Sequence, residues 1–328
     1  MNEIPIFDAH LDLAMNALAG RDITRPAAEQ PLIGDEIATV GLPDLRRGNV
    51  HAVCGTIFCE PAGQNGGYRT PDEAFDIAEK QLRFYHNLHQ QGLLAIPGLP
   101  HPGAAAMECR ILIEGAACIR TPEDVAFFKS AGVEIVGLSW KATQHAGGTG
   151  EPGPLTDSGR SIVAALDELG IVHDVSHLAE ESFWELIELA QGTVIASHSN
   201  CRSIVGDDPN ERHLSDDMIR ALAQRGGVIG INFFDKFLLP ANEYKKRRAT
   251  LNDVIAHIRR VCDLTGNTKQ VGIGTDMDGG LGREQIPQEI TDSADLPLLA
   301  DALKAAGFND ADVRAILFDN WHRVLGPA

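Results

Sequence analysis

The sequence has no long hydrophobic run, few cysteines and few basic residues, and each scarcity excludes a class of protein. None of its 328 residues lies in an apolar run of the roughly 18 residues that a membrane-spanning helix needs. Residues 1–6 have neither the basic stretch nor the apolar stretch of a secretory signal peptide, and no hydrophobic tail precedes Ala328. These absences predict a cytoplasmic protein that neither spans nor is anchored to a membrane.

Cysteine and basic residues are both scarce. The chain has 6 cysteines and no C-x-x-C pair, so we expect reduced, structural thiols and no cysteine-based zinc site. The 28 Lys and Arg residues are outnumbered by 46 Asp and Glu, which gives a formal net charge of -18. Nucleic acids and anionic membrane surfaces bind concentrated positive charge, so neither is an expected partner.

Two nucleotide-binding motifs are absent as well. No G-x-G-x-x-G follows the first apolar run, and no G-x-x-x-x-G-K-[ST] loop occurs. What the chain has instead is an alternation of short apolar runs with amphipathic stretches of helical periodicity. The eight apolar runs are 4–13, 51–59, 110–116, 134–140, 171–177, 193–198, 228–234 and 271–276. The helical stretches include 71–91, 122–131, 159–169, 180–191, 215–225 and 251–265.

Eight buried strands that alternate with helices predict a parallel sheet, and their number favours a (β/α)8 TIM barrel formed by one domain over 1–328. An open sheet with two extra strands is the alternative. Ser215 is a predicted helix N-cap because Asp216 and Asp217 follow it in the first turn. Segments 19–47, 60–70 and 141–156 are predicted loops after strands, on the face where barrels form active sites.

Side chains that can bind metals stand where five of these runs end. His10 and Asp12 are two residues apart, so on a strand they point to the same face. The other strand ends contribute Glu114, His177, His198 and Asp276. Burying this many ionisable groups is costly without a counter-ion, and a metal centre supplies one.

The six side chains are imidazoles and carboxylates, which suit zinc and also manganese, iron or cobalt. Six exceed the three protein ligands of a mononuclear catalytic zinc, so they indicate a two-metal site. Such a site makes hydroxide from water near neutral pH and polarises a carbonyl, which predicts amide or ester hydrolysis.

Each element alone also has a purely structural interpretation. A His-x-Asp pair is often only a hydrogen-bonded pair, and His198 could be a core histidine. Residues 275–279 could form a turn built on Asp side chains. The metal interpretation is favoured because the structural one requires five coincidences on the strands of one barrel.

The motifs resemble those of the membrane dipeptidase (renal dipeptidase) family of metallopeptidases, within the amidohydrolase-like barrels. The similarity extends from Asp8 to Val324, with the motifs in the same order and at similar spacing. The motifs are D-A-H-L-D at 8–12, I-E-G at 113–115, L-T-D-S-G at 155–159, D-V-S-H at 174–177, S-H-S at 197–199, R-H-L-S-D-D at 212–217, G-I-G-T-D-M-D-G at 272–279 and N-W-H-R-V at 320–324.

The resemblance implies a role for each matching residue. His10 and Asp12 would bind one metal, usually zinc, and His177 and His198 the second. Glu114 would bridge the two metals. Asp276 would be the acid/base that handles the proton of the bridging water and then of the leaving amine. Arg212 would bind the carboxylate of the dipeptide, with a solvated loop arginine as the structural alternative, and Asp278 is a further expected substrate contact.

One position departs from the family pattern. The family typically has Leu-Thr-His after the fourth strand, whereas this chain has Leu-Ser-Trp, which places Trp140 among the expected substrate contacts. An indole donates one hydrogen bond and carries no charge, so Lys141 and His145 are candidates to replace the missing histidine. Loss of one such donor can lower the rate on the order of 100- to 1000-fold.

The sequence therefore predicts a binuclear zinc dipeptidase that uses a metal-bridging hydroxide, with substrates that include dipeptides ending in a D-residue. A homodimer is a further implied expectation. The first alternative keeps the chemistry but changes the substrate to another small amide, lactam or ester. The second alternative is a non-catalytic metal-binding homologue, which the retention of Asp276 disfavours.

Overall fold

The computed structural model describes residues 4–63, 67–100, 106–206 and 208–326. All eight predicted strands are present, each inside or close to its apolar run. They are β1 (Ile6–Leu11), β2 (Val50–Phe58), β4 (Met107–Glu114), β5 (Val133–Gly137), β6 (Val172–Asp174), β7 (Val194–Ile195), β8 (Ile229–Ile231) and β9 (Val271–Ile273). A short additional strand, β3 (Leu94–Ala95), pairs with β4. Part of the predicted 60–70 loop, residues 64–66, lies outside the described residues.

The chain divides into two compact units, and β2 runs from the first into the second. The first unit comprises Met1–Val53, Ser197–Asp207 and His213–Pro327. In it β9 pairs in parallel with β1 and β8, with Ile273 opposite both Asp8 and Ile231. The second unit consists mainly of Cys54–Ala196. In it β4, β5, β6 and β7 pair in parallel in chain order.

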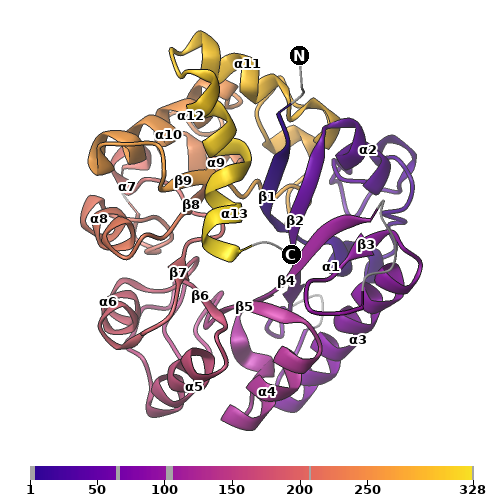
Figure 1. Ribbon diagram of the computed structural model, residues 1–328, viewed down its shortest axis with the longest axis vertical. Coiled ribbons are helices and arrows are strands. Elements are labelled where there is room, and N and C mark those ends of the chain that lie inside the picture. Colours follow the sequence, from indigo (N-terminus) through magenta and orange to yellow (C-terminus); the bar gives the residue numbers. More distant parts are fainter. Residues whose placement is uncertain (1–3, 64–66, 101–105, 207, 327–328) are drawn as a thin grey trace. The chain divides into compact units, whose positions relative to one another are not determined.

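Helices follow the strands in each unit, as the periodicity predicts (Figure 1). The predicted (β/α)8 TIM-barrel fold is confirmed. The second unit contains α3 (Pro71–Gln90), α4 (Pro122–Ser130), α5 (Asp157–Glu168) and α6 (Glu180–Leu189). The first unit contains α1 (Leu13–Leu18), α2 (Leu42–Arg47), α7 (Arg202–Val205), α8 (Asp216–Gln224), α9 (Asp235–Leu238), α10 (Leu251–Thr265), α11 (Leu298–Ala305), α12 (Asp310–Arg314) and α13 (Asn320–Leu325).

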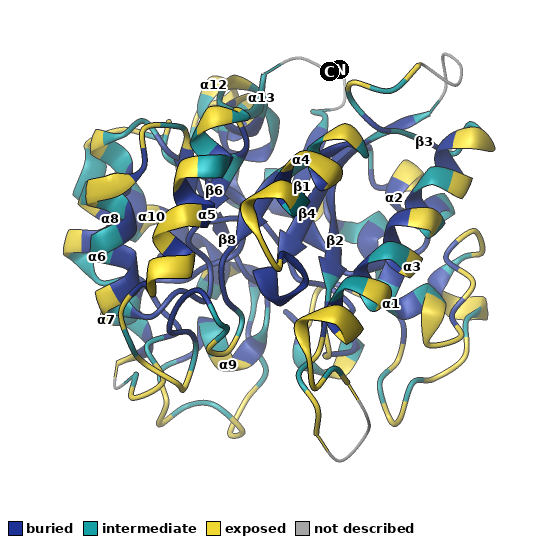
Figure 2. Ribbon diagram, turned by 90° about the horizontal axis from the view of Figure 1, so that it is seen from below, coloured by how far each residue is buried: buried dark blue, intermediate teal, exposed yellow. Residues whose placement is uncertain are grey.

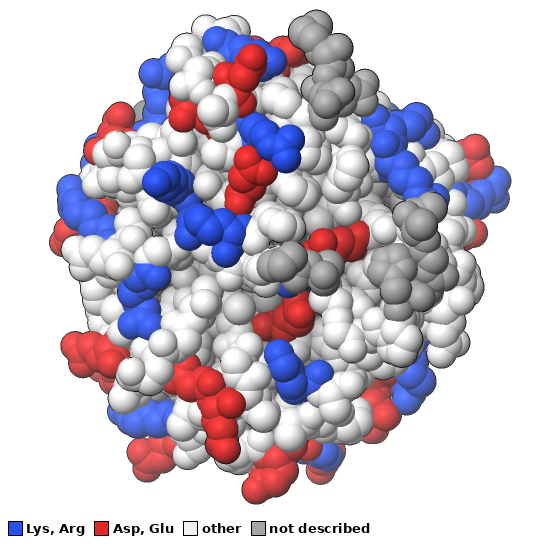
Figure 3. All heavy atoms as spheres, viewed as in Figure 1, with Lys and Arg blue, Asp and Glu red and all other residues white. Residues whose placement is uncertain are grey.

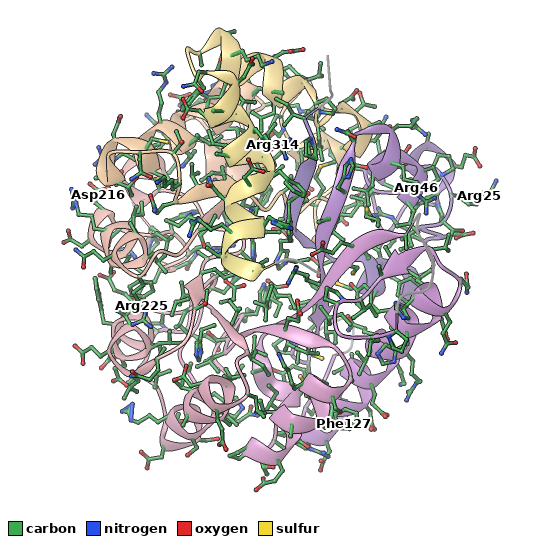
Figure 4. All side chains as sticks on the ribbon, viewed as in Figure 1. Arg25, Arg46, Phe127, Asp216, Arg225 and Arg314 are labelled. Carbon is green, nitrogen blue, oxygen red and sulfur yellow. The ribbon has the colours of Figure 1, made fainter. Side chains whose placement is uncertain are left out.

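Local signals in the sequence explain where several helices begin. Ser215 caps α8 as predicted, because its hydroxyl accepts a hydrogen bond from the Met218 N–H at 3.3 Å. Thr70 caps α3 in the same way through the Glu73 N–H. Asp216, labelled in Figure 4, lies in the first turn of α8 and forms an ion pair with Arg260 of α10. The pair joins two helices of the same unit.

The strands form the buried interior of each unit, and the helices turn their polar faces to solvent (Figure 2). In the first unit, Trp321 of α13 packs on β9 and its indole N–H donates to the Ile273 carbonyl at 3.0 Å. Gly272 is required there because a Cβ at this position would overlap the indole ring. This close contact fixes α13 against the strand that precedes Asp276.

The surface carries charges of both signs, interspersed on the face that Figure 3 shows. Many are paired locally, such as Arg160 of α5 with Glu185 of α6. All six cysteines lie within the described residues, and five of them are buried, as expected for structural cysteines. No helix of the described residues is long and apolar enough to cross a bilayer.

Candidate metal centre

Three predicted site residues converge in the first unit. His10 lies at the end of β1, Asp12 follows it, and Asp276 comes three residues after β9. Each offers a ligand atom, and the three atoms lie within 4.8 Å of one another. The His10 Nε2 is 3.9 Å from Asp12 Oδ2 and 3.9 Å from Asp276 Oδ1. The Asp276 N–H donates to the His10 carbonyl at 3.1 Å, so the two strand ends hold this cluster together.

The space beside these carboxylates is kept open by a glycine. A Cβ on Gly279 would overlap Asp276 Oδ1 and lie 2.9 Å from Asp12 Oδ2. One imidazole and two carboxylates are also the donor set that zinc and related divalent ions accept. The cluster therefore fits a divalent metal ion, with His10 and Asp12 as groups that would hold it and with the Asp276 carboxylate beside them.

His198 stands beside His10, and a buried hydroxyl orients both rings. The ring centroids are 3.6 Å apart. The Ser197 Oγ lies 2.9 Å from His198 Nδ1 and 3.3 Å from His10 Nδ1. A hydroxyl oxygen can accept two hydrogen bonds, so both Nδ1–H groups can donate to it. That tautomer leaves the lone pair of each Nε2 for a metal.

The second unit repeats this arrangement at His177. Its Nε2 lies 3.2 Å from Oε1 of Glu114, the last residue of β4. Its Nδ1 lies 3.0 Å from the hydroxyl of Thr149, in the Gly-rich segment after β5. Glu114 and His177 are both buried, each with 7% of its surface exposed. A buried carboxylate beside an imidazole whose other nitrogen is held by a hydroxyl is again a metal-competent pair.

Backbone strain coincides with the predicted site. His177, Asp276 and Asp278 have φ values of 67°, 61° and 64°. Residues other than glycine rarely adopt positive φ values, and such backbone strain is characteristic of functional positions. The turns after β6 and β9 therefore hold strained residues where each strand ends in a predicted ligand or catalytic group.

Asp278 has a different environment from the other predicted residues. Its Oδ1 accepts from the Thr39 N–H and hydroxyl at 2.8 and 2.7 Å, and its Oδ2 accepts from the Val40 N–H at 3.0 Å. Arg21 forms an ion pair with the same carboxylate at 3.1 Å. These contacts make Asp278 an anchor for the 19–40 loop, a role that the sequence prediction of a substrate contact did not include.

Trp140, which stands where the family pattern has a histidine, lies next to His177. The Trp140 ring is 6.1 Å from the His177 ring and packs edge-to-face on Phe58 at 5.2 Å. The Lys141 Nζ lies 5.5 Å from the Trp140 ring centroid. His145 is wrong as a replacement donor, because it is fully buried and its ring nitrogens bind the Ser158 hydroxyl and the Ile119 carbonyl.

Arg212 is buried, with 4% of its surface exposed, so the alternative of a solvated loop arginine is wrong. The sequence reasoning missed three residues that orient the predicted groups, namely Ser197, Thr149 and Asn232. Ser197 lies within the S-H-S motif at 197–199 and Asn232 within an apolar run, but nothing in their spacing indicates which side chain each one contacts.

A (β/α)8 fold with buried imidazoles and carboxylates at its strand ends defines a metal-dependent hydrolase. The chain belongs to the membrane dipeptidase family, peptidase family M19, whose family model matches residues 1–328. It is accordingly a hydrolase of the dipeptidase type, and the predicted resemblance is confirmed.

The chain is also similar to individual relatives and solved structures. The chain is 30% identical over 272 residues to an uncharacterised protein of the pqqA 5′ region of Klebsiella pneumoniae, which covers 78% of this chain and 97% of the relative. The fold of this chain matches that of a Rhodobacter sphaeroides metallopeptidase bound to a phosphinate mimic of L-Ala-D-Ala. The TM-score is 0.83, the sequence identity is 23%, and 99% of both chains is covered. A probable dipeptidase of Pseudomonas aeruginosa matches with a TM-score of 0.79 and 18% identity, over 98% of this chain and 95% of the relative.

Proposed function

We propose that this protein is a binuclear zinc dipeptidase. His10 and Asp12 would hold one ion and His177 and His198 the other, with Glu114 as the shared ligand, as the family resemblance implies. The observation that carries the proposal is the convergence of the His10, Asp12 and Asp276 ligand atoms within 4.8 Å of one another. They lie beside Gly279, where a side chain would overlap the Asp276 carboxylate. Bound metal supplies Lewis acidity and lowers the pKa of water to near neutrality.

The residues of the chain divide the remaining work. Asp276 takes the proton from the attacking water and returns it to the leaving amine, the task of a general base and then a general acid. Arg212 binds the carboxylate of the dipeptide, for which a guanidinium is suited because its N–H groups match both oxygens. The R. sphaeroides relative binds a mimic of L-Ala-D-Ala, which supports dipeptides with a C-terminal D-residue as substrates.

A direct test changes Asp276 to Asn and assays a panel of L,L- and L,D-dipeptides with the zinc-loaded protein. We expect kcat to fall about 100- to 10,000-fold, the usual contribution of a general acid or base. Asp301→Asn, on the exposed surface of α11, is the matched control and should keep full activity. Full activity of Asp276→Asn would sink the catalytic assignment, and two metal ions per chain by elemental analysis would support the binuclear one.

Trp140 favours a second candidate, the same chemistry on another small amide, lactam or ester. Its ring and that of Phe58 form an apolar edge beside His177, where the family pattern has a histidine. We expect Trp140→His to raise turnover of simple dipeptides if the dipeptidase proposal holds. If the wild-type protein cleaves N-acyl amino acids or lactams in preference to dipeptides and Trp140→His reverses that order, the second candidate is correct.

A further inference from the structure

We propose that Asn232 is the positioning residue that orients Asp276 and reserves its Oδ1 for proton transfer. The inference rests on the proposed function, because it assigns a partner to the proposed acid/base. Asn232 follows β8 and Asp276 follows β9, and these two strands pair in parallel within the first unit. The Asn232 Nδ2 donates to Asp276 Oδ2 at 2.7 Å.

The orientation of the Asn232 amide is fixed by its surroundings. Its Oδ1 accepts from the Phe234 N–H at 2.7 Å, so turning the amide over would leave that donor without its acceptor. The reversed amide would also place its oxygen against the Asp276 carboxylate. The backbone of Asn232 is held as well, since its N–H donates to Asn200 Oδ1 at 2.8 Å and its carbonyl accepts from Asn200 Nδ2 at 3.1 Å.

Burial strengthens the constraint. Asn232 is 0% exposed and Asn200 is 1% exposed, so water does not substitute for these bonds. The side chain of Asn232 thus presents an N–H, and only an N–H, to Asp276. The geometry is set by β8 and by the turn into α9, and does not depend on the conformation of Asp276 itself.

The two oxygens of Asp276 are therefore not equivalent. Oδ2 faces a fixed hydrogen-bond donor, whereas Oδ1 faces His10 Nε2 at 3.9 Å and the space that Gly279 leaves open. The hydrogen bond from Asn232 engages Oδ2 and turns Oδ1 toward that space, so the proposal assigns proton transfer to Oδ1. Asn232 also stops the carboxylate from rotating, which keeps Oδ1 aimed at the reaction space.

The test uses two substitutions that remove the donor in different ways. Asn232→Asp keeps the shape of the side chain, and Asn232→Leu removes the donor without adding charge. At pH 8 with saturating substrate, we expect both to lower kcat about 10- to 100-fold, the usual effect of losing such a supporting contact. KM should change less than about twofold, because Asn232 orients the proton-transfer group and does not bind the substrate.

Asn320→Asp is the matched control. Asn320 is also a buried asparagine of the first unit, and its amide donates to the Thr268 and Val271 carbonyls at 2.6 and 2.8 Å, on α13 rather than beside Asp276. We expect this variant to lose thermal stability as the Asn232 variants do, yet to keep its kcat per folded molecule. A kcat loss equal to that of Asn232→Asp would assign the effect to general destabilisation and overturn the proposal.

A second measurement does not depend on turnover. The visible absorption spectrum of bound cobalt should change in Asn232→Leu relative to the wild-type protein, because the carboxylate beside the ion loses its fixed orientation. An unchanged cobalt spectrum together with an unchanged kcat would overturn the inference. If the wild-type protein binds cobalt but cleaves no dipeptide, the proposed function fails, while the difference between the cobalt spectra still tests the orientation of Asp276.

Discussion

At the residue scale, the predicted metal ligands are arranged by small hydroxyl and amide side chains. Ser197 contacts the Nδ1 atoms of His10 and His198, and Thr149 contacts that of His177. A neutral imidazole has one donor and one acceptor nitrogen, so an Nδ1–H that donates to a hydroxyl leaves the Nε2 lone pair for a metal ion. The amide of Asn232 likewise orients the Asp276 carboxylate by donating a hydrogen bond to its Oδ2.

Ser197→Ala should therefore weaken metal binding without unfolding the protein. Both imidazoles lose the acceptor for their Nδ1–H groups, and we expect metal affinity to fall about 10- to 100-fold. Competition with a chromophoric chelator measures this affinity. Ser293→Ala removes another buried hydroxyl of the first unit and should leave the affinity unchanged. Equal affinities for the Ser197 variant and the wild-type protein would contradict the assigned role.

At the scale of elements, the site residues stand on strand ends and on the turns that follow them. Several strands are only two or three residues long, such as β7 and β8, so each turn begins close to the buried interior. The turn residues His177 and Asp276 are buried in spite of their strained φ values. Neighbouring strands and the capped helices behind them supply the rigidity that holds such positions.

Removing the cap of α8 tests this dependence. Ser215→Ala deletes the hydroxyl that accepts from the Met218 N–H, and we expect a loss of about 1 kcal/mol in the free energy of unfolding. Urea unfolding followed by circular dichroism measures it. Turnover by the folded protein should be unchanged, because the cap contacts no predicted site residue. A stability equal to that of the wild-type protein would mean that solvent replaces the cap.

At the scale of the whole molecule, stability should depend on pH through a buried histidine. His257 is fully buried, accepts from the Cys201 N–H at 3.0 Å and lies 3.1 Å from the Leu238 carbonyl. Burial lowers its pKa from 6.5 to about 4, an effect that the Leu238 carbonyl and the nearby charge of Asp253 only partly oppose. Below pH 6.5, His257 of the unfolded chain takes up a proton, whereas His257 of the folded protein is protonated only near pH 4.

The contribution of His257 to stability is therefore complete above pH 6.5 and is lost as the pH falls toward 4. His257→Asn should be less stable than the wild-type protein at pH 8, with a difference that shrinks between pH 6.5 and 4.5. Urea midpoints of both proteins across this range provide the measurement. A difference that stays constant with pH would show that His257 titrates normally in the folded protein.

Metal binding should also stabilise the whole fold, because the converging ligands exist only in the native state. Zinc at about 100 times its dissociation constant should add about 2.7 kcal/mol to the free energy of unfolding. Thermal melts of metal-stripped protein with and without zinc measure this gain. Asp12→Asn should reduce the gain, whereas Asp301→Asn should preserve it. Equal zinc responses in all three proteins would place the bound zinc elsewhere.

The sequence by itself determined the eight strands, the helices that were predicted between them and the family of the chain. Apolar runs and helical periodicity are local properties, and the motifs that carry the resemblance are short segments that can be recognised in the chain. The C-terminal helices α11 to α13 and the short strand β3 were not predicted, because brief elements leave too few residues for a periodic pattern.

Only the tertiary structure decided which side chain meets which. It brought the Asp278 carboxylate to the Thr39 and Val40 N–H groups and buried His145 against the Ile119 carbonyl. It also placed the Asn232 amide on Asp276 and the Ser197 hydroxyl between two imidazoles. These contacts join residues up to 239 positions apart, and their hydrogen-bond geometry follows from strand pairing and turn conformation, which residue spacing does not encode.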